Sequence, residues 1–278
     1  AGTSNIFIQK LDSNGNFIWA KSIGGITGTF FDKIPYSLKI DGNNNVYIAG
    51  FFKNTVDFDP SSNVFNLTSN GNEDIFICKL DSNGNFLWAI NMGGGFADRA
   101  YAMDVNLQGS VYITGAFGGT ADFDPSPGVL NLTTAGSYDI FIAKYDSLGS
   151  FNSAISFEGV SGADYAYGII VDSNNSIYTT GTIYGSTDFD PSINTSYAGG
   201  NGVGNTFICK IDSTNSLIWA ESNQAFSSKS ITIDNLGFVY ITGQYFNGQD
   251  LDPTNGIDTF NSKGLYITKI NSNGNYIW

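Results

Sequence analysis

The chain has 278 residues, of which 41% are hydrophobic, 15% aromatic and only 13% charged, and its formal net charge is −13 with no histidine. Proteins bind phosphate backbones and anionic lipid surfaces through clustered Lys and Arg, so this composition argues against nucleic acid as a partner and against docking on a membrane. No stretch of the sequence is long and apolar enough to span a bilayer, so membrane insertion is not expected.

One segment recurs along the chain and defines its organisation. The clearest copies are Asn5–Gly25 and Asp74–Gly94, the latter reading DIFICKLDSNGNFLWAINMGG, and further copies begin at Asp139, Thr206 and Gly264. The lysine that all copies share recurs every 59 to 69 residues, at Lys10, Lys79, Lys144, Lys210 and Lys269. A fixed period of this length predicts a tandem array of supersecondary units.

Each period carries four strand signals. In the second copy these are Ile75–Leu80, Phe86–Met92, Tyr101–Val105 and Val111–Gly115, and the turn Asp81–Asn85 joins the first two. Alternate residues of the first strand are apolar on both faces, which is typical of a sheet covered by neighbours on both sides. The turn carries a glycine where a hairpin needs positive φ. No segment has a helical period of useful length.

This pattern predicts an all-β fold, a β-propeller built from four-stranded blades of roughly 65 residues. The sequence predicts a half-blade at 5–23 and full blades at about 34–92, 101–157, 166–222 and 229–278. A parallel β-helix has a much shorter repeat. Four and a half blades leave the ring open, so we expect the chain to be part of a larger propeller, with a five-bladed closure as the second choice.

The two cysteines, Cys78 and Cys209, occupy the same position in two different copies of the repeat. Because those copies are two blades apart, we expect no disulfide and interpret both residues as small buried hydrophobes. This usage does not define a redox compartment, and no signal peptide is recognisable.

An acidic motif follows the last strand of each inner hairpin and is the strongest candidate for chemistry. Its pairs of aspartates are Asp57 and Asp59, Asp122 and Asp124, Asp188 and Asp190, and Asp250 and Asp252. Alternation places both carboxylates of a pair on one side of the chain, so they could bind Ca²⁺ together, with loop oxygens completing about six to eight ligands. The alternatives are a structural role, in which the aspartates form turns before proline while Phe58 and its counterparts fill the core, and direct ligand binding.

Aromatic residues also recur with the period. The tryptophans Trp19, Trp88, Trp219 and Trp278 could stack on sugars, but their fixed place in the strand pattern favours packing between blades. The turns of the type Asp81–Asn85 begin like an EF-hand loop, yet they lack its glycine at position six and its glutamate at position twelve, so hairpin turns are predicted. Histidine is absent, neither cysteine has a catalytic partner, and no phosphate-binding glycine loop is recognisable, so catalysis is not expected.

The chain resembles the SBBP family of repeats, the "seven-bladed β-propeller" repeats of secreted and surface proteins of bacteria. The resemblance rests on DIFICKLDSNGNFLWA, on VYITGAF with GGTADFDP, and on the glycine pair after the tryptophan strand, and it covers essentially the whole chain. The acidic, Asn-rich form is similar to repeats common in Bacteroidota, which often precede a domain for type IX secretion. The third copy departs from the pattern, because Ser153 stands at the tryptophan position.

The resemblance implies a secreted protein, extracellular or at the outer-membrane surface, with no defined enzymatic activity. Two hairpin turns, at Ser147 and Ser213, are similar to the short O-glycosylation signal of Bacteroidota, and Asn66 and Asn131 match the N-glycosylation pattern.

The sequence therefore predicts a non-catalytic binding or scaffold module, such as an adhesin or part of a surface assembly. Its predicted partners are a protein or glycan at the cell surface, further repeats of the same protein, or another surface subunit. The alternative is a carbohydrate-binding or carbohydrate-active propeller, stabilised by calcium, with paired acids at the mouth of the central channel.

Overall fold

The computed structural model describes residues 5–24, 32–160, 162–246, 248–252 and 258–278. All regular structure in these ranges is β-strand, and the strands pair in chain order as antiparallel ladders. The first ladder is the two-stranded hairpin of β1 (Ile6–Leu11) and β2 (Phe17–Ile23).

The strands that follow group into four blades, of which the second and third are joined in one sheet by the pairing of β14 with β16. The first contains β3 (Lys33–Ile40), β4 (Val46–Phe52), β7 (Asp74–Leu80) and β8 (Phe86–Gly94). The second contains β9 (Arg99–Val105), β10 (Val111–Phe117), β13 (Asp139–Tyr145) and β14 (Phe151–Gly159). The third contains β15 (Tyr165–Val171), β16 (Ile177–Asp188), β17 (Tyr197–Ile211) and β18 (Leu217–Asn223). The fourth contains β19 (Ser227–Ile233), β20 (Val239–Tyr245) and β21 (Gly264–Ile270).

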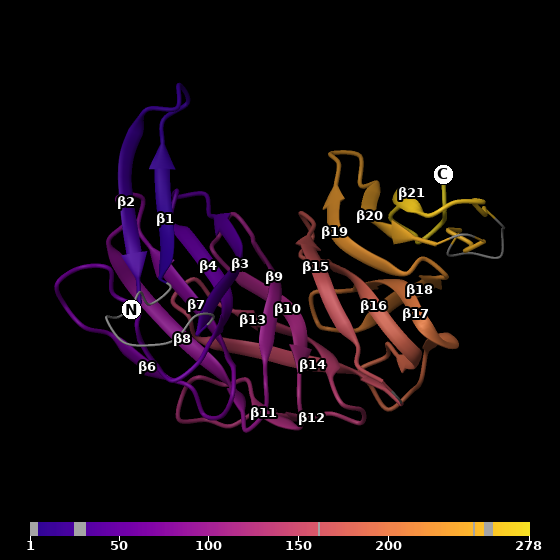
Figure 1. Ribbon diagram of the computed structural model, residues 1–278, viewed down its shortest axis with the longest axis horizontal. Coiled ribbons are helices and arrows are strands. Elements are labelled where there is room, and N and C mark those ends of the chain that lie inside the picture. The colour runs from indigo at the N-terminus through magenta and orange to yellow at the C-terminus, as the bar shows by residue number, and fades with distance from the viewer. Residues whose placement is uncertain (1–4, 25–31, 161, 247, 253–257) are drawn as a thin grey trace.

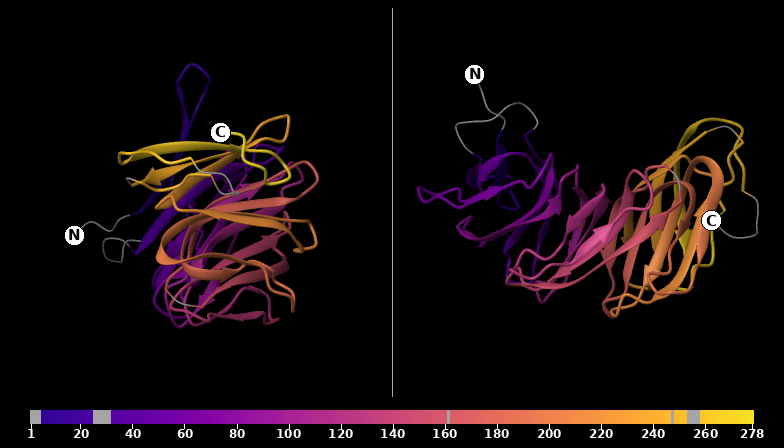
Figure 2. Two further views of the ribbon diagram at one scale, coloured as in Figure 1. Left: turned by 90° about the vertical axis from the view of Figure 1, so that its right-hand side faces the viewer. Right: turned by 90° about the horizontal axis from the view of Figure 1, so that it is seen from below.

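The blades stand side by side along a curved row (Figures 1 and 2). The first strand of each blade, β3, β9, β15 or β19, lies on the inside of the curve and contacts the first strand of the next blade. The row is open between the β1–β2 hairpin and β21. The fold is therefore all-β and propeller-like, as the sequence predicts, and it forms an arc rather than a closed five-bladed ring.

Short hairpins that carry the acidic motif link each blade to the one before it. They are β5 (Thr55–Asp57) with β6 (Asn66–Thr68), β11 (Thr120–Asp122) with β12 (Asn131–Thr133), and the outer ends of β16 and β17. β11 pairs with β8 of the preceding blade, and β16 pairs with β14. These segments look like polar loops in the sequence, because strands of three residues have too few positions to show alternation.

The core lies between the sheets. Every residue of β4, β7 and β10 is buried, since these middle strands are covered on both faces. The middle residue of the acidic motif is buried in each copy, as phenylalanine in the first three and as Leu251 in the fourth. The Phe123 ring centre lies 5.5 Å from that of Phe117 and 4.9 Å from that of Phe141. Cys78 and Cys209 are buried and unpaired, as predicted.

The hairpin turns are built as predicted. In the first blade, Asp81 Oδ1 accepts hydrogen bonds from the backbone N–H groups of Asn83 and Asn85 at 2.8 and 2.9 Å, and Gly84 has a φ of 78°. Side-chain acceptors of this kind satisfy the turn's own donors. The fourth blade differs from the prediction, because its last segment forms only a bridge between Ile270 and Tyr276 and leaves Trp278 half exposed.

Candidate functional site: the inner-strand face and the acidic hairpins

The inside of the arc carries a row of side chains at β-bulges. The antiparallel register skips one residue in each inner strand: Tyr36 in β3, Tyr101 in β9, Tyr167 in β15 and Lys229 in β19. A glycine of the neighbouring strand lies against each bulge, and a Cβ on Gly115, for example, would overlap the carbonyl group of Arg99. A bulge re-aims a side chain out of the regular pleat. We call these four residues and the side chains in contact with them the inner-strand face.

The rings of the inner-strand face form a continuous row. Ring centres are 5.1 Å apart between Tyr36 and Tyr101 and 5.2 Å apart between Tyr101 and Tyr167. The Lys229 Nζ atom lies 3.8 Å from the centre of the Tyr167 ring, which is cation–π geometry. Tyr165 stacks on Tyr167 at 6.0 Å. Burial raises the pKa of Tyr101 and Tyr167, so both hydroxyls remain neutral hydrogen-bonding groups at neutral pH.

A charged cluster borders this row. Arg99 forms an ion pair with Glu73, whose other oxygen lies 3.0 Å from Lys53 Nζ. The Arg99 guanidinium also donates to the Tyr101 hydroxyl at 3.4 Å and lies 5.4 Å from the centre of the Phe51 ring. Burial opposes ionisation of Glu73, but the hydrogen bonds from Arg99 and Lys53 outweigh it and lower the pKa of this carboxyl.

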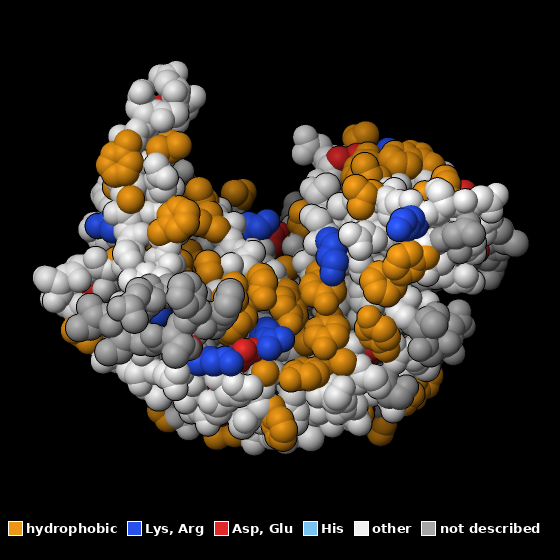
Figure 3. All heavy atoms as spheres, viewed as in Figure 1, with side chains coloured by type: hydrophobic (Ala, Val, Ile, Leu, Met, Phe, Trp, Pro, Cys, Tyr) orange, Lys and Arg blue, Asp and Glu red, His pale blue; other side chains and the backbone are white. Residues whose placement is uncertain are grey.

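The electrostatic character of the inner edge differs from that of the whole chain. Lys, Arg and hydrophobic side chains gather along the inside of the arc (Figure 3), although the chain's net charge is −13. One lysine, Lys39, pairs with Asp104 of the next blade at 3.1 Å, and Asp104 accepts a hydrogen bond from the N–H of Val171 at 2.9 Å. Polar contacts therefore tie three consecutive inner strands together and hold the face rigid.

The acidic hairpins use their carboxylates within their own turns. Asp122 Oδ1 accepts hydrogen bonds from the N–H groups of Asp124 and Leu130 at 3.0 and 2.9 Å, and Asp124 Oδ1 accepts one from Ser126 at 2.9 Å. The same first-aspartate bonds recur at Asp57, Asp188 and Asp250, and the second-aspartate bond recurs at Asp59 and Asp190. The turn role that the sequence suggests is thus present in the structure.

The calcium role of these hairpins stays a prediction. Within the described ranges, no group of three or more Asp, Glu, His or Cys side chains is arranged to hold a metal ion. Each aspartate pair would need backbone or solvent oxygens for most of a calcium shell.

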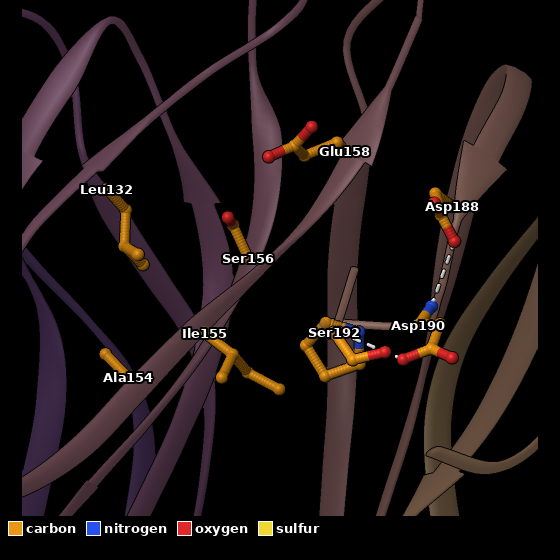
Figure 4. Close-up of a pocket in the computed structure, with 9 residues that line it drawn as sticks. Leu132, Ala154, Ile155, Ser156, Glu158, Asp188, Asp190 and Ser192 are labelled. Carbon is orange, nitrogen blue, oxygen red and sulfur yellow. Dashed lines mark hydrogen bonds between the residues drawn. The ribbon is translucent and has the colours of Figure 1, made fainter. Parts of the chain in front are cut away.

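A groove runs beneath the acidic hairpin of the third blade. This cavity of about 240 Å³ lies between β14 and that hairpin, and Glu158, Asp188 and Asp190 line it together with Ser156 (Figure 4). The preceding blade has a related groove lined by Asp124 and other counterparts. Because the groove recurs with the repeat, it is a general feature of how each hairpin covers the blade before it.

Trp19, Trp88 and Trp219 pack between blades, as predicted, whereas Trp278 is half exposed. The Trp88 Nε1–H group donates to the carbonyl oxygen of Ser147 in the next blade at 3.2 Å, and Lys79 Nζ donates to the same oxygen at 2.9 Å. The Trp88 ring also covers Gly149, where a Cβ would lie 3.2 Å from ring atoms. Trp19 and Trp219 make the same bond to Ser82 and Ser272. Sequence reasoning found the packing role but not the shared acceptor.

The two predicted glycosylation residues differ in their surroundings. Ser213 is exposed on its turn, whereas Ser147 is partly buried and accepts the bonds from Lys79 and Trp88 through its carbonyl group. Modification of either hydroxyl stays a prediction.

Comparisons with known proteins agree with a repeat protein of the propeller type. The chain is 29% identical to an uncharacterised WD repeat-containing protein of Acanthamoeba polyphaga mimivirus, over 76% of this chain and 17% of that protein. It is 24% identical to the regulatory protein FlaEY of Caulobacter vibrioides, over 54% of this chain and 15% of that protein. The chain thus matches less than a fifth of the length of either relative. No family model matches the chain.

One solved structure, a protein of unknown function from Bacteroides caccae, aligns over 100% of this chain and 89% of its own chain, with 11% identity and a TM-score of 0.40. The described part of the chain contains no apolar helix of the length needed to cross a membrane.

Proposed function

We propose that the chain is a non-catalytic binding and scaffold module that holds a protein partner against its inner-strand face. The observation that carries this proposal is the row of Tyr36, Tyr101 and Tyr167, which ends at Lys229 and is bordered by Arg99. Tyr and Arg are the residue types that dominate binding energy in protein interfaces. The similarity to a WD repeat-containing protein is consistent with a module of this kind.

The geometry of the face supports binding with little loss of entropy. Its aromatic side chains rest on one another, and the inner strands beneath them are joined by the Lys39–Asp104 ion pair and the Asp104–Val171 hydrogen bond. Side chains that are already immobilised lose less freedom when a partner docks. Tyr36 is 47% exposed, so the row is open to solvent at its first-blade end.

We propose a binding role rather than an enzymatic one because of the hydrogen bonds and the repetition of the acidic side chains. In the groove of Figure 4, Asp188 and Asp190 each have one oxygen occupied by backbone donors of the hairpin. A glycosidase needs two acids in distinct environments facing one cleft, whereas these acids repeat from blade to blade. Membership of the SBBP repeat family and a location outside the cell or at its outer surface are part of the same proposal, and they rest on the resemblance of the sequence motifs.

The experiment is a comparison of two tyrosine sites. Immobilised chain would be panned against a random peptide library displayed on phage, and the selected peptides would be measured with variants. We expect Tyr101→Ser combined with Tyr167→Ser to weaken binding at least about tenfold, as loss of interface hot spots does. The matched control is Tyr197→Ser, because Tyr197 is 58% exposed but lies on the outer end of β17.

Two outcomes would overturn the proposal. Selected peptides that bind the Tyr101→Ser, Tyr167→Ser variant as well as the unchanged chain would place the site elsewhere. Selective binding on a glycan array, lost in the same variant, would favour the carbohydrate alternative that stacked tyrosines also allow.

A further inference from the structure

A buried pair of aspartates lies at the junction of the first and second blades. Asp74 is the first residue of β7, and Asp98 immediately precedes β9; both are completely buried. Gly93, near the end of β8, separates them: a Cβ on this glycine would lie 2.8 Å from Asp74 Oδ1 and 3.0 Å from Asp98 Oδ2. Two carboxylate oxygens from different blades therefore converge on Gly93, where a side chain could not fit.

Backbone donors hold both side chains in place. Asp98 accepts hydrogen bonds from the N–H groups of Gly94 and Gly118 at 2.7 and 3.0 Å, and Asp74 Oδ2 accepts one from Asn70 at 2.9 Å. Donors of this kind favour the ionised form of a carboxyl. Burial acts in the opposite direction, and it raises the pKa of each of these carboxyls to about 6. Two carboxyl groups from different blades thus share one buried site.

One oxygen of this pair lacks a partner. Asp74 Oδ1 is fully buried and accepts no hydrogen bond from the described part of the chain. The side-chain amide of Asn91 is close enough to favour the charged form of Asp74, and it donates to the carbonyl oxygen of Thr68 at 3.3 Å. An unpaired, buried carboxylate oxygen costs free energy unless a cation or a donor meets it.

At the two neighbouring junctions, other side chains of the protein lie at the corresponding positions and provide the partners. Between the β1–β2 hairpin and the first blade, the corresponding glycine is Gly24, and the side chains over it are Asn5 and Lys33. Here the chain itself supplies a buried cationic side chain in place of the second acid.

Between the second and third blades the acids are Asp139 and Asp164, which lie near Gly159; this glycine aligns with Gly94, and Glu158 stands at the Gly93 position. The counterpart of Asp74 Oδ1, Asp139 Oδ1, accepts a hydrogen bond from the N–H group of Gly159 at 3.3 Å. Asp164 accepts hydrogen bonds from the Thr187 hydroxyl at 2.6 Å and from the backbone N–H of Tyr184 at 2.8 Å. The residue at the Thr187 position in the second blade is Ala121, which has no hydroxyl and is fully buried.

From these differences we infer that Asp74 and Asp98 bind a divalent cation, calcium, in the space above Gly93. One Ca²⁺ ion neutralises both charges and supplies the missing partner of Asp74 Oδ1. Calcium accepts irregular sets of oxygen ligands at about 2.3–2.6 Å, including backbone carbonyls and water, whereas Mg²⁺ requires near-octahedral geometry. The site is distinct from the acidic hairpins, and it joins two blades.

Thermal unfolding at pH 7.5 tests the site directly. We expect about 1–5 mM calcium, the range in which extracellular modules bind, to raise the Tm of the unchanged chain by at least about 3 °C relative to chelator. Magnesium at the same concentration should have a much smaller effect. The response should disappear in Asp98→Asn and should persist in the controls Asp164→Asn and Asp122→Asn with Asp124→Asn.

Two further variants separate binding from folding. Asp74→Asn with Asp98→Lys reproduces the Asn5–Lys33 pair, so it should unfold at a Tm that calcium leaves unchanged. Ala121→Thr introduces the hydroxyl that Asp164 uses, so it should raise the Tm in chelator and reduce the calcium response.

Three results would overturn the inference: no calcium response in the unchanged chain, a response that survives Asp98→Asn, or a response that is lost only when the hairpin acids are changed. A Tm that depends on pH but not on calcium would show that the pair shares a proton instead.

Discussion

Two successive blade junctions use the same architecture with different side chains. At the junction of the first and second blades, Trp88 donates to the Ser147 carbonyl oxygen and its ring lies on Gly149. At the junction of the second and third blades, Ser153 stands at the tryptophan position and Asn215 at the glycine position. Among the described residues, Lys144 donates no hydrogen bond to Ser213, and its Nζ lies 5.4 Å from the centre of the Tyr112 ring.

The difference shows why the two positions change together. Gly149 and Asn215 have similar backbone conformations, with φ values of 83° and 69°. Asn tolerates this left-handed conformation better than most residues, so the backbone alone does not require glycine. Glycine is required where an indole ring covers the Cα atom, and a residue with a Cβ is accepted where serine replaces the tryptophan.

The largest expected effect tests whether the two blades have equivalent hydrophobic cores despite this difference at their junctions. Phe123→Ala and Phe189→Ala each remove a fully buried ring from the acidic motif, in the second and third blades respectively. Both should lower the free energy of unfolding by about 3–5 kcal/mol, and by similar amounts. Urea denaturation measures both; a loss below about 1 kcal/mol in either variant would mean that the ring does not fill the core there.

The second prediction compares the buried acids of the two junctions. The pKa of Asp98 and that of Asp164 are each raised to about 6, in both cases mainly by burial. A carboxyl whose folded pKa lies above its unfolded value stabilises the protein when protonated. This stabilisation is complete below pH of about 4 and is lost as the pH rises through about 6.

In chelator, the unchanged chain should therefore lose roughly 2 kcal/mol per acid between pH 4.5 and 7. Asp164→Asn should reduce this slope, as should Asp98→Asn. Calcium should flatten the contributions of Asp98 and Asp74, which bind it together, and leave that of Asp164. Urea denaturation across this pH range gives the measurement, and an unchanged slope in both variants would contradict the raised pKa values.

The third prediction separates two free-energy costs of a Cβ at the turn's left-handed position: backbone strain and contact with the indole ring of the preceding blade. Gly149→Ala introduces a Cβ into the left-handed region and against the Trp88 ring, so it should cost about 2 kcal/mol. Asn215→Ala meets only the backbone cost, about 1 kcal/mol. If urea denaturation gives equal losses for the two variants, the ring does not impose the glycine.

The sequence predicts the parts of this fold that repetition makes visible. The shared lysines, the turns of the type Asp81–Asn85 and the packing of the tryptophans are all recognisable, because each recurs at a fixed offset and follows a local rule. The acidic hairpins show the limit: their aspartates suggested a turn role or a metal, and spacing alone did not decide between them. Their Oδ1 atoms accept bonds from their own turns, and the metal stays a prediction. Which donors meet an oxygen depends on loop geometry that spacing does not contain.

The inner-strand face and the Asp74–Asp98 pair were not predicted, for a different reason. Tyr36, Tyr101 and Tyr167 were assigned to strands, but the bulges that redirect them depend on pairing between strands. Asp74 lies at the start of the repeated segment, and Asp98 lies in the linker before the next blade, where Asp164 is its counterpart in the following copy. The sequence does contain a sign of the pairing, because the first copy has Asn5 at the Asp74 position and Lys33 in its linker. Only the structure of the blade junction shows that these two residues meet.

The smallest expected effect concerns the hydrogen bond between blades. Trp88→Phe keeps most of the ring area over Gly149 but removes the Nε1–H donor, so the Ser147 carbonyl oxygen retains only Lys79 as a partner. Loss of one such bond should cost about 1 kcal/mol in urea denaturation. The reverse change, Ser153→Trp with Asn215→Gly, should give the second and third blades the same contact and stabilise the chain by a similar amount.

The double variant is the sharper half of this test, because the two substitutions should act together. Ser153→Trp alone places an indole ring against the Cβ of Asn215, and Asn215→Gly alone frees the backbone without a ring to cover it. A double-mutant cycle should therefore show a coupling free energy of at least about 0.5 kcal/mol in favour of the pair. Additive effects would mean that the indole and the glycine are independent, and that the two junctions differ for separate reasons.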